Sequence, residues 1–162
     1  MADFSFDVVS DFDHQELVNA LDQVRREIAT RYDFKSSTCT LELGKSEVTL
    51  TANDDFRAAA VKDLVLTKAT RRGLSLKVFD WGKLEPAAGG TVRQRIGLRK
   101  GLNADQGREL SRHVREEFPR VKVSIQGDAL RVSAPSKDML QAVIADLRGL
   151  DYPVALQFIN YR

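Results

Sequence analysis

The amino-acid sequence predicts an α+β protein made of two ferredoxin-like βαββαβ units, each with helices on one face of a four-stranded antiparallel sheet. Three observations predict this fold class. Segments that alternate apolar and polar residues, typical of half-buried strands, are separated by segments of helical periodicity. Their order, strand–helix–hairpin–helix–strand, occurs twice. The 162 residues are 43% hydrophobic and 30% charged, so the chain should fold around a core, as one ordinary domain or two small ones.

The first half begins with a strand and a helix. Phe4–Val9 alternates apolar and polar residues, which predicts the strand. Asp13 follows as a helix N-cap, with Glu16 at capping-box spacing, and an apolar stripe extends the helix to about Tyr32. Residues 38–51 alternate on both sides of a turn, which predicts a hairpin.

A second helix and a further strand complete this half. Residue 53 or 54 caps the helix, which ends at Gly73 behind two arginines. Residues 76–81 then predict a strand. Residues 82–90 contain a proline and three glycines without periodicity, and we expect them to be a linker.

The second half repeats this order. Val92–Leu98 predicts a strand with one basic face, and a helix follows from residue 103 to about 118. Residues 121–133 predict a second hairpin. Ser136 caps the last helix, and residues 155–161 predict the last strand.

Residue matches between the halves indicate an internal repeat. Residues 48–52 read VTLTA and residues 130–134 read LRVSA, and the helices that follow share an apolar pattern. Such matches fall on the same elements in the same order, which favours duplication. Because the strands alternate, the sheet face away from the helices should be polar and open to a ligand or to the other unit.

Several segments resemble the YajQ family of bacterial proteins, and they extend from the first predicted strand to the last residue. They are SFDVVS at residues 5–10, TRYDFK at 30–35, DDF at 54–56, RRG at 71–73, IQG at 125–127 and LQFINYR at 156–162. The resemblance implies a nucleotide-binding protein with domains like the RNA-recognition fold, in a family with some members linked to cyclic di-GMP. Residues 79–90 depart from the family pattern.

The resemblance also implies that the two units exchange their first strands. The first domain is then expected to span residues 11–100 and to be completed by the strand at residues 92–98. The second is expected to span residues 101–162 together with the strand at residues 3–9.

No catalytic or metal site is predicted. His14 and His113 lie on different helices, and neither has another histidine or a cysteine at ligand spacing. Cys39 is the only cysteine, which excludes an internal disulfide, and its inward strand position favours core packing over a nucleophile. The sequence contains no nucleophile elbow, Walker loop or Rossmann glycine motif. We therefore expect binding without enzymatic activity, cofactor or metal.

The strand at Val92–Leu98 carries the first candidate binding residues. The candidates are Arg93, Arg95 and Arg99 on this strand and Lys77, Phe79 and Trp81 on its expected neighbour. Guanidiniums on one strand face can bind phosphates bidentately, and outward aromatic rings can stack on bases. The alternative is that the aromatic residues pack against the other domain while the arginines pair with nearby acids.

The second hairpin and the last strand supply a second candidate surface. Neither hairpin carries the aromatic residues that RNA-recognition domains use for stacking. The C-terminal outward residues are instead polar, and they suit either a guanine edge or simple solvation. They are Lys122, Ser124, Gln126, Arg131, Ser133 and Gln157.

Two functions remain open. The first is binding of RNA or a nucleotide, with a guanine-containing cyclic dinucleotide such as cyclic di-GMP among the candidates. The second is a regulatory module that contacts the transcription machinery. The net charge of +2 is nearly neutral, so it does not point to any one class of partner. No apolar run approaches the roughly 18 residues of a membrane span, and the start lacks signal-peptide features, so we expect a cytoplasmic protein without a membrane partner.

Overall fold

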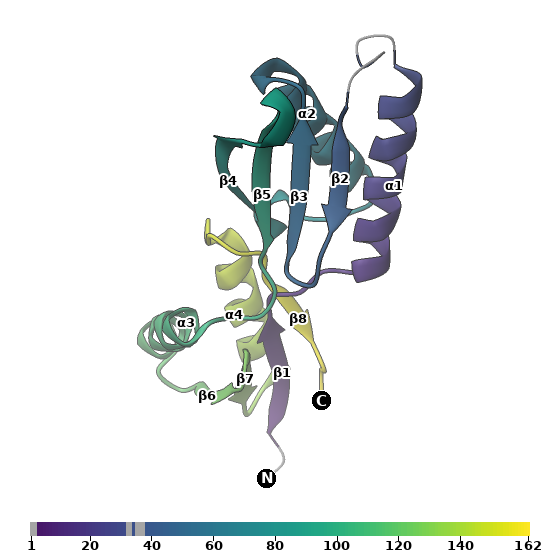
Figure 1. Ribbon diagram of the computed structural model, residues 1–162. Coiled ribbons are helices and arrows are strands. Elements are labelled where there is room, and N and C mark those ends of the chain that lie inside the picture. The colour runs from purple at the N-terminus through teal and green to yellow at the C-terminus, as the bar shows by residue number, and fades with distance from the viewer. Residues whose placement is uncertain (1–2, 32–33, 35–37) are drawn as a thin grey trace. The chain divides into compact units, whose positions relative to one another are not determined.

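The computed structural model describes residues 3–31, 34 and 38–162, and these form two compact units (Figure 1). One unit is Phe12–Arg99, and the other joins the described residues up to Asp11 to Lys100–Arg162. Each unit contains one four-stranded antiparallel sheet and two α-helices. The predicted fold class is therefore confirmed.

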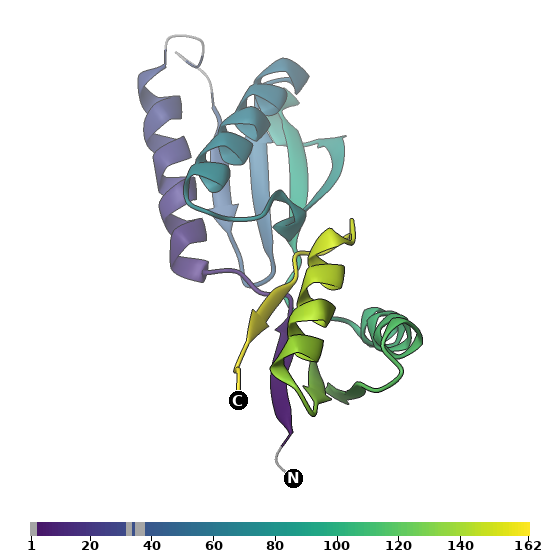
Figure 2. The same cartoon turned by 180° about the vertical axis from the view of Figure 1, so that it is seen from behind.

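The unit Phe12–Arg99 has the strand order β2-β3-β5-β4. Its strands are β2 (Thr40–Leu43), β3 (Glu47–Ala52), β4 (Phe79–Pro86) and β5 (Val92–Leu98), and its helices are α1 (His14–Thr30) and α2 (Asp55–Arg71). Both helices cover the same face of the sheet, as the view in Figure 2 shows. Neither α1 nor α2 lies on the opposite face of these strands (Figure 1).

The other unit has the strand order β6-β7-β1-β8. Its strands are β1 (Phe4–Val9), β6 (Lys122–Gln126), β7 (Ala129–Ala134) and β8 (Gln157–Ile159), and its helices are α3 (Ala104–Glu117) and α4 (Lys137–Gly149). Its core joins Phe6 and Val8 of β1 to Leu130 and Val132 of β7, and all four are fully buried.

The exchange of first strands is part of the observed fold. β1 lies antiparallel to β7, with a register that runs from Phe4 opposite Ala134 to Val8 opposite Leu130. β5 lies antiparallel to β3 and takes the central position that a first strand holds in a βαββαβ unit. The residues that complete the second sheet therefore come from the start of the chain.

Each of the four α-helices described above starts at a side-chain cap, at the position that the sequence predicts. The carboxylate of Asp13 accepts hydrogen bonds from the backbone N–H groups at the start of α1, and Asp54 does the same for α2. Asn103 and Gln106 form a reciprocal capping box on α3, and Ser136 caps α4. These local contacts explain why the helix starts could be read from sequence.

The expected linker at residues 82–90 is wrong, because most of it belongs to a strand. β4 continues to Pro86, and Ala88–Gly90 forms a short 3-10 helix before β5. The register of β4 against β5 shifts between Trp81 and Leu84, which marks a β-bulge. The bulge interrupts the alternation, so the segment has no strand periodicity in the sequence.

Gly82 allows this bulge to sit tightly against β5. A Cβ atom at Gly82 would lie 2.6 Å from the backbone oxygen of Arg95. The side chain of Gln94 donates a hydrogen bond of 2.7 Å to the Gly82 carbonyl and fastens the bulge to the central strand.

Three smaller differences concern element ends. Residues 76–78 form a 3-10 helix rather than the start of a strand. β8 ends at Ile159, before Asn160 takes a positive φ of 58°. The predicted end of the first helix near Tyr32 lies outside the described residues, and α1 ends at Thr30. None of the helices in the described ranges has the length and apolar content needed to cross a membrane.

Candidate functional site

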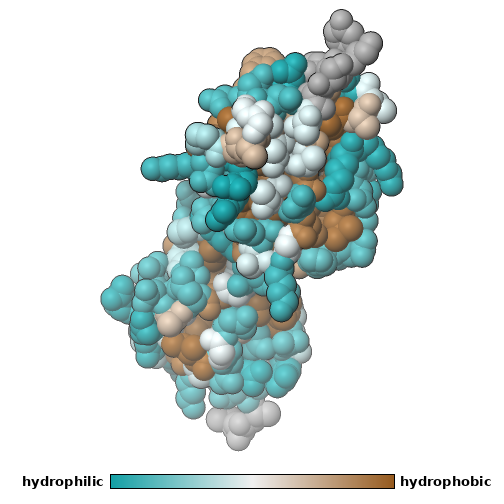
Figure 3. Space-filling view, in the orientation of Figure 1, coloured by the Kyte–Doolittle hydropathy of each residue, from teal (hydrophilic) through white to brown (hydrophobic). Residues whose placement is uncertain are grey.

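The free face of the sheet in Phe12–Arg99 brings the predicted arginines together. β3 buries Val48 and Leu50 toward the helices, so Thr49 and Thr51 point to the opposite face. The register places Thr49 beside Arg95 and Thr51 beside Arg93. We call this surface the arginine face; its residues are Glu42, Thr49, Thr51, Asp80, Glu85, Arg93, Arg95 and Arg99. Hydrophilic and neutral colours predominate over these strands in Figure 3.

Two arginines of this face share one carboxylate. The Nε atom of Arg93 lies 3.2 Å from Oε1 of Glu85, and the Nε atom of Arg95 lies 3.8 Å from the same oxygen. The side chains of Arg93 and Arg95 are 37% and 59% exposed. Two guanidiniums against one carboxylate leave a local positive charge and several N–H donors directed to solvent.

Arg99 and Lys77 lie at the end of the same sheet, and Lys77 is not on the neighbouring strand as expected. Lys77 belongs to the 3-10 helix, and its backbone carbonyl accepts a hydrogen bond of 3.3 Å from Arg99 Nη1. Arg99 Nη2 also pairs with Asp80 at 3.3 Å. Arg99 therefore has more intramolecular partners than Arg95.

The expectation that Phe79 and Trp81 accompany the arginines is wrong. Trp81 lies opposite Ile96, which is 1% exposed and faces the helices, and Phe79 is itself 3% exposed. Lys62 of α2 lies over the Trp81 ring, 4.7 Å from its centroid. The two aromatic residues thus pack on the helix side of their own unit, because the 3-10 turn before β4 reverses the alternation assumed from the sequence.

The free face of the other sheet collects the C-terminal candidates. β7 buries Leu130 and Val132, so Arg131 and Ser133 point away from the helices. Cross-strand neighbours follow from the register, with Ser124 opposite Arg131 and Lys122 opposite Ser133. We call this surface the C-terminal polar face; its residues are Ser5, Asp7, Lys122, Ser124, Gln126, Arg131, Ser133, Gln157 and Asn160.

A buried carboxylate organises this second face. The side chain of Asp7 is 10% exposed and lies directly opposite Arg131. Arg131 donates from Nε to one Asp7 oxygen at 3.0 Å and from Nη2 to the other at 3.4 Å. Asn160 donates a third hydrogen bond at 2.8 Å. The hydrogen bond from Arg131 is the main cause that lowers the pKa of Asp7, although burial acts in the opposite direction.

Asp7 and Asn160 were not among the predicted site residues. A signal existed, since Asp7 is an acid inside an apolar strand and occupies the outward phase of its alternation. Its partner is 124 residues away in the sequence and becomes its neighbour only through the exchanged strand. Three other candidates of this face also form hydrogen bonds: Gln157 accepts from the backbone N–H of Asp11 at 2.7 Å, and Gln126 donates to Ser124 at 3.1 Å.

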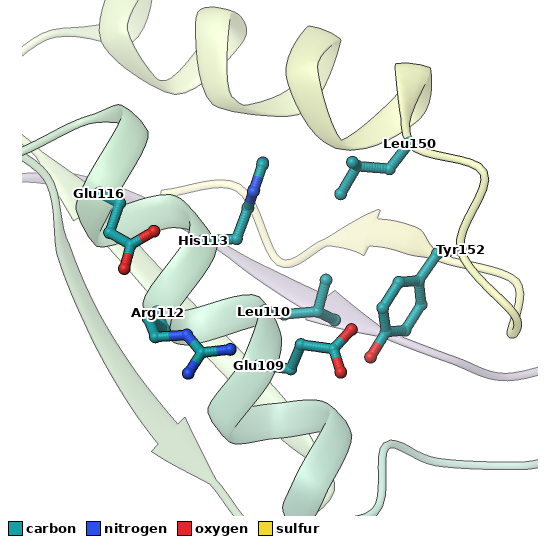
Figure 4. Close-up of a pocket in the computed structure, with 7 residues that line it drawn as sticks. All are labelled: Glu109, Leu110, Arg112, His113, Glu116, Leu150 and Tyr152. Carbon is teal, nitrogen blue, oxygen red and sulfur yellow. The ribbon is translucent and has the colours of Figure 1, made fainter.

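A small cavity of about 220 Å³ lies on the helix side of the same unit (Figure 4). It is lined by Glu109, Leu110, Arg112, His113, Glu116, Leu150 and Tyr152. Burial, with the nearby charge and hydrogen bond of Glu109, raises the pKa of Tyr152 to about 12. The cavity is smaller than the roughly 300–1,000 Å³ of most ligand pockets.

His113 connects two helices. Its Nε2 atom lies 2.6 Å from Oδ2 of Asp146, which joins α3 to α4. Among the described residues, no group of three or more His, Cys, Asp and Glu side chains is arranged to hold a metal ion. Cys39 lies just before β2 and packs against the core of its unit.

Two ferredoxin-like sheets with exchanged central strands define a duplicated α+β fold. A family profile described as "Nucleotide-binding protein YajQ-like" matches residues 4–162. The chain therefore belongs to the YajQ-like family.

Relatives of similar length share about half of the residues. A protein of Synechococcus elongatus, named a nucleotide-binding protein, is 56% identical over 158 residues, which cover 98% of this chain and 97% of the relative. Proteins with the same descriptive name from Trichormus variabilis and Picosynechococcus are 52% and 51% identical, again over 98% of this chain, and the matches cover 98% and 97% of those relatives.

Proposed function

We propose that this chain binds a nucleotide-containing ligand through the arginine face, with Arg93 and Arg95 in contact with phosphate. The observation that carries the proposal is the shared carboxylate: two exposed guanidiniums have Glu85 between them at 3.2 and 3.8 Å. The names of the relatives support a nucleotide as the source of the anion.

A phosphate can replace Glu85 at little cost. Surface ion pairs contribute only about 0–1 kcal/mol, since water screens them and the side chains lose freedom. A phosphate offers more acceptor oxygens than one carboxylate and can be held by both guanidiniums at once. Thr49 and Thr51 lie opposite Arg95 and Arg93 and add hydroxyl donors beside the same position. The central strand β5 fixes the spacing of the arginines.

Binding without turnover is part of the proposal. Two acids of this face, Glu85 and Asp80, are already engaged by arginines, and the described outward residues of the face include neither a histidine nor a cysteine. Nucleophilic catalysis needs a nucleophile within hydrogen-bond reach of a base. We therefore expect no hydrolysis of a bound nucleotide by groups on this face.

Calorimetric titration with GTP, ATP, cyclic di-GMP and a short single-stranded RNA tests the proposal and separates the candidate ligands. The double variant Arg93→Ala/Arg95→Ala should bind the best ligand about tenfold more weakly or worse, because two charge-assisted contacts are lost. On RNA, the slope of affinity against salt should flatten by roughly 0.7 for each phosphate contact removed. Glu85→Gln should strengthen binding, because the competing carboxylate is gone.

Arg115→Ala on α3 is the matched control. Arg115 is an exposed arginine on a helix of the other unit, so its loss removes the same charge without touching the arginine face. The proposal is wrong if the folded double variant binds every ligand as tightly as the parent. A loss of binding in Trp81→Ala, with the double variant unaffected, would move the site to the edge strand β4.

A further inference from the structure

β6 is an edge strand of its sheet, with β7 as its neighbour on one side only. The two strands join through a two-residue loop that starts at Gly127 with a φ of 62°, as in type II′ hairpin turns. Gln126 and Ala129 flank this loop, so their backbone groups face each other. By the alternation of an antiparallel ladder, the N–H and C=O groups of Val123 and Ile125 then point away from β7. No described residue forms a hydrogen bond with these outward groups.

The other three edge strands are protected against pairing with a further strand. β4 carries the bulge at Gly82 and ends at Pro86. β8 is three residues long, and Asn160 with its positive φ follows it. On β2, the side chain of Arg25 donates to the Leu41 carbonyl from Nε at 3.2 Å and from Nη2 at 2.7 Å. β6 has five residues, and neither a bulge nor a proline interrupts them. Among the described strands, β6 is therefore the edge most open to strand addition.

Apolar surface accompanies this open edge. Ile125 lies beneath α3, where a Cβ atom at Gly107 would be 3.9 Å from its Cδ1 and Cγ2 atoms. Even so, Ile125 is 49% exposed, and Val123 on the same side of the strand is only partly buried. Figure 3 shows hydrophobic side chains at the surface between α3 and β6, which Figure 1 labels. An added strand would place its own side chains beside these two and remove them from water.

The rim of the edge is basic. Lys122, at the start of β6, is exposed. His113 pairs with Asp146 of α4 and so marks the side of α3 that faces α4. Arg108 and Arg115 lie roughly 140–160° around the helix from His113, on the side toward the open edge. Both arginines are exposed.

These charges decide between two occupants of the edge. A second copy that paired through β6 about a two-fold axis would bring its α3 alongside, with Arg108 and Arg115 of both copies close together. Like charges brought together at an interface oppose association, whereas an acidic segment meets the arginines with opposite charge. Arg108 also pairs with Asp105 within α3, but the two side chains are 64% and 89% exposed. A partner's carboxylate can therefore replace Asp105 at little cost.

We propose that β6 binds an extended, acidic segment of a partner protein as a fifth strand of this four-stranded sheet. In this mode of recognition, main-chain hydrogen bonds provide affinity and alternate side chains provide specificity. The outward groups of Val123 and Ile125 supply the main-chain bonds, and the apolar side chains of the segment cover Ile125. Its carboxylates meet Lys122 and the two arginines of α3. The site lies within one unit, so the proposal is independent of the arginine face.

The first test uses a short synthetic peptide that alternates glutamate and valine, titrated against the full chain by fluorescence anisotropy. This peptide should bind and should protect the amides of Val123 and Ile125 from hydrogen exchange. A lysine–valine peptide has the wrong charge, and a glutamate–valine peptide N-methylated on every amide has lost its donors. Each should bind at least about tenfold more weakly. Equal affinity of the N-methylated peptide would overturn strand addition, and equal affinity of the lysine peptide would overturn the acidic partner.

Variants of the chain locate the site. Ile125→Pro removes an outward N–H and leaves the ladder with β7 intact, a position at which sheets tolerate proline. It should weaken binding of the glutamate–valine peptide about tenfold, whereas its matched control Ile125→Val should bind nearly as tightly as the parent. Arg108→Gln should weaken the same binding and reduce its dependence on salt. Its matched control is Arg26→Gln, which removes an exposed arginine from α1 in the other unit.

The remaining outcomes are also decisive. A folded Ile125→Pro variant that binds the acidic peptide as tightly as the parent would contradict the site on β6. If this variant does not fold, the N-methylated peptide answers the same question. Protected amides at Val123 and Ile125 in the peptide-free chain, together with a dimeric mass in light scattering, would show that a second copy covers the edge and that the proposal is wrong. Absence of binding by the acidic peptide would reject it as well.

Discussion

The central strands β5 and β1 hold equivalent positions in their two sheets. The ion pair on β5 is exposed, whereas the ion pair on β1 is buried. β5 presents Arg93 and Arg95 around Glu85, whose side chain is 45% exposed. β1 presents Asp7, whose side chain is 10% exposed and which accepts three hydrogen bonds. An exposed pair is screened by water, whereas a buried charge depends on its partners. Glu85 is therefore easier to displace than Asp7, and the proposed function predicts that a phosphate takes its place between the arginines.

The largest expected effect tests how the two sheets are assembled. Residues 12–99 contain every strand of the sheet β2-β3-β5-β4, so this fragment should fold and melt cooperatively. Residues 100–162 lack β1, which supplies the fully buried Phe6 and Val8, and this fragment should not fold. Circular dichroism and amide hydrogen exchange on both fragments measure the difference.

A complementation experiment provides the control. A synthetic peptide of residues 3–11 added to the fragment 100–162 should restore protected amides in β7, its hydrogen-bonded neighbour. Cooperative melting of residues 100–162 alone would contradict the assigned role of β1. The fragment 1–82 also lacks β5 and should not fold, although it contains the first predicted half.

The next largest effect is expected at Asp7, the buried counterpart of Glu85. Asp7→Asn should lower the free energy of unfolding by about 2 kcal/mol, because hydrogen bonds to a charged group in a protected site are lost. Amide exchange in β1 and β7 should accelerate, while the fluorescence of Trp81, which reports on the other unit, should change little. Urea denaturation followed by both signals measures this. If Asp7→Asn were as stable as the parent, the cost of burying the Asp7 carboxylate would equal the stabilisation that it gains from Arg131.

Much of the fold could be predicted from the sequence because its signals are local. Asp13, Asp54 and Ser136 cap helices through contacts within three residues. The alternation in β5, β6 and β7 identified outward residues of both faces, including Arg131 and Ser124 on the C-terminal side. The exchange of strands came from the family resemblance, since a strand's own residues do not specify which distant partner it joins.

The misplaced residues depended on features that break periodicity. A single 3-10 turn at Leu76–Val78 changed the phase of the following strand, which moved Phe79 and Trp81 to the buried side. The bulge at Gly82 then removed the alternation from the rest of β4. Asp7 and Arg131 were missed as a pair because their contact needs the tertiary register, not the local pattern.

A smaller effect concerns acid stability. Arg131 lowers the pKa of Asp7 from its ordinary value of 3.8, so the folded state favours the ionised carboxylate. A lowered folded-state pKa contributes stability that is complete above the unfolded value and is lost as the pH falls through the folded value. The stability difference between the parent and Asp7→Asn should therefore be constant from neutral pH down to about 5 and shrink below 4. Urea titrations at several pH values check this, and a difference that grows on acidification would contradict it.

The smallest effect is expected on the arginine face itself, where the comparison is sharpest. Glu85→Gln removes the carboxylate between Arg93 and Arg95 but leaves an amide of the same shape, so it should change the free energy of unfolding by less than about 1 kcal/mol. The side chains of Arg93 and Arg95 are exposed to water, so the loss of Glu85 leaves neither guanidinium as a buried charge without a partner. The same substitution should raise the affinity for phosphate-bearing ligands and make it more sensitive to salt. Denaturation and titration on one preparation measure both. A marked loss of stability would mean that Glu85 organises its face as Asp7 does, and a weaker affinity would mean that the acid positions the arginines instead of competing with the ligand.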